Sequence, residues 1–209
     1  MIGALNSFRD GWIVTKRNLY RYIRLPQLIV FSSIQPIMFL TLFNFVFGGA
    51  IGVSVASGGK YINYLLPGIM VQTILFGALQ TGIGLSRDLN AGIIDRFRSL
   101  PMSRSAVLTG RTTADLVRNV TTALILLAMG FVYGFRFSNG TLDAFLMILM
   151  IVAFGYAFSW VAAFVGLAVK DEETAQLAGF LFIFPLTFAS ATFVPTQTMP
   201  EWLQKFANN

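Results

Sequence analysis

Long stretches without charged residues divide this chain. They cover residues 25–59, 61–86, 119–135, 144–169 and 174–200. A helix that crosses a bilayer needs about 20 mostly apolar residues, and each stretch provides a segment of roughly that length. The pattern therefore predicts an all-α integral membrane protein, a single transmembrane domain over residues 1–209 with five spans at 28–47, 64–85, 116–135, 144–169 and 175–194.

The first 25 residues have a different pattern, that of an amphipathic basic helix. Apolar residues recur on one side of a helical wheel, and polar residues fill the other. The apolar side holds Leu5, Phe8, Trp12, Leu19 and Ile23, and the polar side holds Arg9, Asp10, Lys16, Arg17, Arg21 and Arg24. This pattern predicts an interfacial helix over 1–25, in the plane of an anionic leaflet and ended by Pro26. A solvated basic segment that only orients the first span is the alternative.

Composition agrees with a membrane protein and removes several kinds of chemistry. The chain is 56% hydrophobic and 11% charged, and it contains neither Cys nor His. Disulfides, thiolate catalysis and the commonest metal-ligand sets are therefore excluded, and we expect no catalytic residue and no metal site. Gly58-Gly59-Lys60 lacks the other residues of a phosphate-binding loop, so we expect no ATP site on this chain.

The distribution of basic residues predicts the orientation. With a cytoplasmic N-terminus, 12 of the 15 Lys and Arg residues fall in inside segments. Only Lys60, Arg136 and Lys205 fall outside. Short cytoplasmic loops carry this excess in membrane proteins, so the net charge of +6 reports topology and requires no nucleic-acid partner.

The connection between the second and third spans, residues 86–115, is long enough to have its own structure. We predict a helix from Arg87 to Leu100, closed by Pro101, and a second helix that begins after the N-cap residue Ser103 and continues into the third span. Ile93, Ile94, Phe97 and Leu100 form an apolar stripe along the first of these helices. Such a helix is suited to a groove on a partner protein; a surface loop resting on the membrane is the alternative.

Several segments, taken in order, resemble the type 2 permeases of ATP-binding-cassette transporters, and most closely the daunorubicin-resistance type from actinobacteria. They are Gly92-Ile93-Ile94-Asp95-Arg96-Phe97-Arg98-Ser99-Leu100-Pro101-Met102-Ser103-Arg104 with Gly110-Arg111, Tyr64-Leu65-Leu66-Pro67-Gly68, Gly134-Phe135-Arg136-Phe137, Phe193-Val194-Pro195 and Met199-Pro200-Glu201-Trp202-Leu203. Their order and spacing together carry the resemblance, which extends over nearly the whole chain.

The resemblance implies a cytoplasmic coupling helix that inserts into a cleft of a separate ATP-hydrolysing subunit. Its contact residues would be Ile94, Asp95, Arg96, Phe97, Arg98, Leu100, Pro101 and Met102. ATP and Mg would be bound by that partner subunit, and this chain would bind no cofactor. A second permease, identical or homologous, would complete the membrane part. Family members usually have six spans, with short extracellular helices between the fifth and the sixth. Residues 195–209 would correspond to these short helices. We expect that the sixth span is missing through truncation or lies outside the given sequence.

These observations predict the permease subunit of an ATP-driven exporter for an amphipathic drug-like or lipid-like compound, in contact with membrane lipid in the cytoplasmic membrane. A non-transporting scaffold that anchors a cytoplasmic ATPase is the alternative. Ion-coupled carriers need ionisable groups inside the membrane, and the predicted span centres contain none. Candidates for the substrate pathway are Gln35, Asn44, Gln72 and Gln80 with the aromatic Phe39 and Phe43; in the alternative interpretation the amides only join neighbouring helices.

Overall fold

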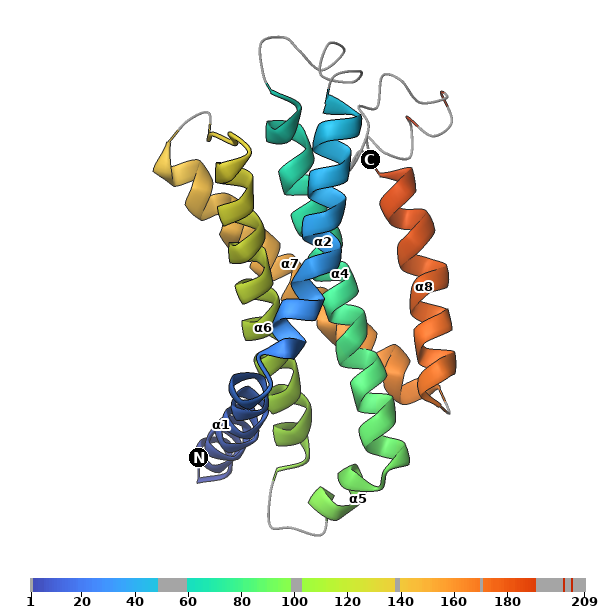
Figure 1. Cartoon of the computed structure of the whole chain (residues 1–209). Coiled ribbons are helices and arrows are strands. Elements are labelled where there is room, and N and C mark those ends of the chain that lie inside the picture. The colour runs from blue at the N-terminus through green and yellow to red at the C-terminus, as the bar shows by residue number, and fades with distance from the viewer. Residues whose placement is uncertain are drawn as a thin grey trace.

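The computed structural model describes residues 2–48, 60–98, 103–137, 140–169 and 171–190, together with Glu201 and Gln204. The regular elements over these ranges are all helices, as predicted. They are α1 (Ile2–Arg24), α2 (Gln27–Val46), α4 (Tyr61–Asn90), α5 (Ile93–Arg98), α6 (Arg104–Val132), α7 (Thr141–Ala168) and α8 (Glu172–Ala189). Figure 1 shows a bundle of long helices with α1 and the short α5 at the same end.

Among the described residues, four helices are long and apolar enough to cross a membrane, and they overlap the first four predicted spans. Their apolar segments are Ile29–Val46, Tyr61–Asn90, Ser105–Val132 and Leu142–Ala168. The fifth predicted span, 175–194, is covered by α8 as far as Ala189. Residues 191–194, and all of 195–209 except Glu201 and Gln204, lie outside the described residues. The fifth span and the extracellular short helices therefore stay predictions.

Helix α4 is the centre of the bundle and contacts α2, α6, α7 and α8. Its side chains Leu65, Leu66 and Ile69 are completely buried. Where α4 crosses α7, a Cβ atom added to Gly82 or Gly166 would overlap the backbone of the opposite helix. Small residues allow helix backbones to approach this closely in a membrane, where packing and not the hydrophobic effect drives helix association.

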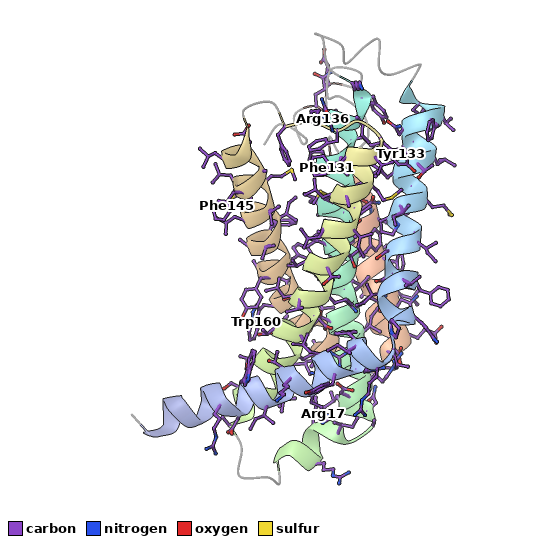
Figure 2. All side chains as sticks on the ribbon, turned by 60° about the vertical axis from the view of Figure 1, so that its left-hand side comes forward. Arg17, Phe131, Tyr133, Arg136, Phe145 and Trp160 are labelled. Atoms are coloured by element: carbon purple, nitrogen blue, oxygen red, sulfur yellow. The ribbon has the colours of Figure 1, made fainter. Side chains whose placement is uncertain are left out.

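Helix α1 lies across the lower part of the bundle, against α6, and does not run along the bundle axis (Figure 2). Gly11, Val14 and Thr15 are buried, whereas Trp12 is 58% and Ile23 72% exposed. The apolar side predicted from the sequence therefore faces away from the protein at these two positions. An interfacial helix needs this arrangement, with one face on protein and an aromatic, apolar face available to lipid.

The connection between α4 and α6 differs from its prediction. A continuous helix from Arg87 to Leu100 is wrong, because α4 extends to Asn90 and Gly92 adopts φ +68 before α5 begins at Ile93. This left-handed conformation is easy for glycine and interrupts a right-handed helix. Ser103 is the N-cap residue of α6, as predicted. Its backbone N–H donates to Asp10 Oδ2 of α1 at 3.2 Å.

A buried polar network joins α1, α4 and α6 next to this connection. Its centre is Asp115 of α6, whose side chain is 1% exposed. The Tyr22 hydroxyl of α1 donates to Asp115 Oδ1. Arg111 donates through Nε to Asp115 Oδ2 at 3.3 Å and through Nη1 to Asp88 Oδ2 of α4 at 2.6 Å. Arg118 Nη1 lies 4.0 Å from Asp115 Oδ1.

Charge balance makes this network stable in a poorly hydrated place. Two carboxylates, Asp88 and Asp115, pair with two guanidinium groups, those of Arg111 and Arg118. This pairing matters because an unpaired buried charge costs several kcal/mol. Burial, followed by the neighbouring Asp115 carboxylate, raises the pKa of Tyr22 to about 12. The phenol therefore stays protonated at physiological pH and keeps donating its hydrogen bond across the α1–α6 contact.

We predict that Gly110→Ala separates α1 from α6. A Cβ atom at position 110 would lie 2.6 Å from Val14 Cβ and 2.9 Å from the Gly11 carbonyl oxygen. Overpacking of this kind costs about 1–3 kcal/mol, so amide hydrogen exchange should accelerate along α1. The control is Ala128→Leu, a larger change at an exposed position of the same helix. Unchanged protection of α1 in Gly110→Ala would contradict the packing.

A second prediction concerns the hydrogen bond between Tyr22 and Asp115. Tyr22→Phe should weaken α1 docking by about 1.5–3 kcal/mol, the range for hydrogen bonds to charged groups. Limited proteolysis of α1 measures the effect, with Tyr20→Phe as control because Tyr20 is 49% exposed on the same helix. In the parent protein, the raised pKa contributes stability that is complete below pH 10.0 and is lost as pH rises toward 12. Equal cleavage of both variants would show that the bond does not hold α1.

Candidate functional site

A cavity of about 170 Å³ opens between α2, α4 and α6, with α8 at one side. It combines aromatic walls with polar groups. The aromatic residues are Phe39, Phe76 and Phe180, and the polar residues are Ser32, Gln35, Gln72, Thr73, Gln80, Arg118, Asn119 and Thr122. Pockets that bind small molecules are mostly apolar with a few converging polar groups. This cavity is therefore the candidate functional site of the membrane domain.

The cavity brings together four of the six residues proposed from the sequence for the substrate pathway. Gln35 and Phe39 come from α2, and Gln72 and Gln80 come from α4. Phe43 and Asn44 do not line it. Phe43 instead stacks on Phe47 with ring centroids 5.1 Å apart and packs against the core. The shared cavity could not be read from spacing alone, because it depends on how α2 and α4 face each other.

Three glutamine amides in the cavity wall make no hydrogen bond among the described residues, whereas the fourth amide, Asn119, accepts from Arg118. Over the described residues, no hydrogen bond joins the side chain of Gln35, Gln72 or Gln80 to another group. Gln35 and Gln80 are also exposed. If these amides served only to join neighbouring helices, such bonds would be present. The observed arrangement favours groups that are available to water or to a polar ligand.

Arg118 is a wall residue that sequence reasoning did not assign to the pathway. It lies in the middle of α6, about 21 Å from the helix end at Val132 at about 1.5 Å per residue. It is near the start of the predicted third span, 116–135, and its Cζ lies 5.7 Å from the ring centre of Tyr22 on α1. The expectation that ionisable groups are absent near the span centres therefore stays a prediction. The available signal was an Arg near the start of a predicted span with an Asp three residues earlier, since ionisable groups in membrane helices often mark functional sites.

Two glycines of α4 make room for the polar side chains of α6. A Cβ atom on Gly77 would overlap the Asn119 amide, and one on Gly84 would overlap the Arg111 guanidinium. Arg118 Nη2 also donates to the Gly77 carbonyl oxygen at 2.9 Å and to Asn119 Oδ1 at 3.3 Å. The cavity wall and the buried network are consequently one continuous polar structure along the α4–α6 contact.

The predicted coupling helix is represented by α5, at the end of the bundle where α1 also lies (Figure 1). Within it, Ile94 is half-buried and Arg96 is exposed. For Asp95, Phe97 and Arg98 only the helical backbone is described, and Leu100, Pro101 and Met102 lie outside the described residues. The contact residues as a set therefore stay a prediction.

Near the same end of the bundle, α8 is tied to α4 by an exposed ion pair. Arg87 Nε donates to Glu172 Oε2 at 2.8 Å, and the pair lowers the pKa of the Glu172 carboxyl. Asp171 caps α8 by accepting the backbone N–H of Thr174 at 2.7 Å. These contacts fix the start of the helix that brings Phe180 to the cavity.

Comparison with known proteins supports an assignment of family. Residues 9–208 match the family model described as ABC-2 type transporter. The chain is 31% identical over 188 residues to a daunorubicin resistance ABC transporter permease protein of Streptomyces coeruleorubidus, which covers 90% of this chain and 65% of the relative. It is 28% identical over 193 residues to a probable doxorubicin resistance ABC transporter permease protein of Mycobacterium tuberculosis, covering 92% of this chain and 68% of the relative.

A putative transport permease of Porphyra purpurea is 27% identical over 187 residues, which covers 88% of this chain and 64% of the relative. The chain thus spans about two thirds of the length of these relatives. The match covers the described helices from most of α1 through α8. With its order of long apolar helices and the short helix between the second and third, the chain belongs to the ABC-2 type transporter family.

Proposed function

We propose that this chain is the membrane-spanning permease subunit of an ATP-driven exporter for an amphipathic drug-like or lipid-like compound. The observation that carries the proposal is a cavity with aromatic side chains and three glutamine amides that make no hydrogen bond among the described residues, in a chain of the ABC-2 family. The names of two relatives, which refer to resistance to daunorubicin and doxorubicin, support an amphipathic substrate.

Energy for export would come from a separate subunit that binds ATP and Mg. The helix α5 is proposed to insert into a cleft of this subunit through Ile94, Asp95, Arg96, Phe97, Arg98, Leu100, Pro101 and Met102. Apolar residues would seat the helix, and its charges would select the partner. Because Ser103, which precedes α6, is bonded to Asp10 of α1, a movement of α5 would reach α1 and α6 together.

The proposed orientation places α1 and α5 on the cytoplasmic side of the cell membrane. The excess of basic residues at this end supports it. A second permease copy, or a homologous permease, would complete the translocation path, because paired subunits related by twofold symmetry are the commonest assembly.

The coupling role predicts the outcome of a double substitution. Phe97→Asp with Leu100→Asp should abolish co-purification of the ATPase subunit and substrate stimulation of its activity, while the permease still inserts into the membrane. Charges cannot enter an apolar cleft without a large loss of hydration energy. Phe97→Leu with Leu100→Ile is the matched control and should keep both properties. Normal stimulation in the Asp variant would refute the assigned contact.

Orientation is tested in this naturally cysteine-free chain. Lys60→Cys and Asn90→Cys introduce single thiols at exposed positions on either end of α4. In intact cells an impermeant maleimide should label position 60, and it should label position 90 only after lysis. The reverse pattern would overturn the proposed orientation and leave the fold unaffected.

A further inference from the structure

The charge of the cavity wall discriminates between classes of ligand. Arg118 is the one formally charged side chain among the described residues that line the cavity, and none of these lining residues is acidic. A polar group that enters the cavity therefore meets amides, hydroxyls and one guanidinium. Between packed helices the effective dielectric constant is lower than in water, so a nearby charge has a larger effect on binding than it has in water.

Arg118 lines the cavity, and two of its guanidinium nitrogens make no hydrogen bond among the described residues. Its Nη2 bonds to Gly77 and Asn119, but neither Nε nor Nη1 makes a hydrogen bond to another described residue. The nearest carboxylate oxygen to Nη1 is that of Asp115 at 4.0 Å. Arg presents its N–H groups in a planar fork that matches the oxygens of a phosphate or carboxylate.

The carboxylates of the buried network, Asp115 and Asp88, do not line the cavity. Asp115 is 1% exposed and is absent from the lining, and its oxygens already accept from Tyr22 and Arg111. Asp88 is paired with Arg111. A cation in the cavity would therefore face Arg118 without reaching a carboxylate of the network, whereas an anion would face an available donor.

The size of the cavity restricts what it can hold. Its volume of about 170 Å³ is below the roughly 300 Å³ at which pockets for whole drug-sized ligands begin. It accommodates a polar head group and adjoining atoms. Phe39 and Phe180, which enter the wall from α2 and α8, are placed to contact the apolar part that follows.

We infer that this cavity binds the oxyanion head group, phosphate or carboxylate, of an amphiphile and selects against a cationic ammonium head group. The inference rests on the proposed function, because it names the substrate class for the same cavity.

The test uses the full permease with its ATPase subunit in phosphatidylcholine nanodiscs, and the readout is displacement of fluorescent dodecyl phosphate. Competitors with the same tail are dodecyl phosphate, dodecyl maltoside and dodecyltrimethylammonium, and empty nanodiscs correct for partitioning. We expect dodecyl phosphate to displace the probe at a concentration at least about tenfold lower than the ammonium compound. Equal potency of the two would overturn the inference. Inorganic phosphate should fail to displace the probe, and displacement by it would show a site for small oxyanions and not for amphiphiles.

A substitution that leaves the buried network intact isolates the cause. Gln80→Glu places a carboxylate in the wall at an exposed position and should remove or reverse the preference for phosphate. The control is Gln176→Glu, the same change on α8 at an exposed position that does not line the cavity; its preference should equal that of the parent. An unchanged preference in Gln80→Glu would overturn the inference. Displacement does not require ATP hydrolysis, so loss of ATPase stimulation with normal selectivity would count against the proposed function alone.

Discussion

The buried carboxylate of Asp115 is the group on which the arrangement of α1, α4 and α6 depends. Three side chains from α1 and α6 converge on it, and one of them, Arg111, continues to Asp88 of α4. Removing one partner from such a group leaves an uncompensated charge where water is scarce, which costs about 3–5 kcal/mol. The network therefore fixes α1, α4 and α6 relative to one another, together with the close packing of Gly110 against Val14 and Gly11.

The same network connects the two places where function is proposed. On one side, Arg118 extends from it into the cavity wall. On the other side, Asp10 of α1 holds the backbone of Ser103, between α5 and α6. A displacement of α5 would thus be transmitted to α1 and to α6, and Arg118 of α6 also borders the cavity. Contiguous networks of this kind are a physical route for coupling between sites.

Sequence periodicity predicted the elements well and the charged contacts poorly. The long apolar helices could be found because a membrane requires apolar runs of bilayer length. The break at Gly92 was not found, because glycine also occurs within helices and its φ of +68 depends on the local structure. Gln35, Phe39, Gln72 and Gln80 were identified as polar or aromatic residues in spans, and their meeting in one cavity was not predictable since it requires the relative rotation of α2 and α4.

By itself, the sequence determined the all-helical class, the long apolar helices, Ser103 as the residue before α6, and the uneven distribution of basic residues. These properties depend on local patterns that hydrocarbon and helix geometry dictate. The tertiary structure alone decided that Arg118 enters a cavity while Asp115 is sealed behind it. These residues are neighbours on one helix, three positions apart, and only the packing of α1 and α4 against α6 gives one an open face and the other a closed one.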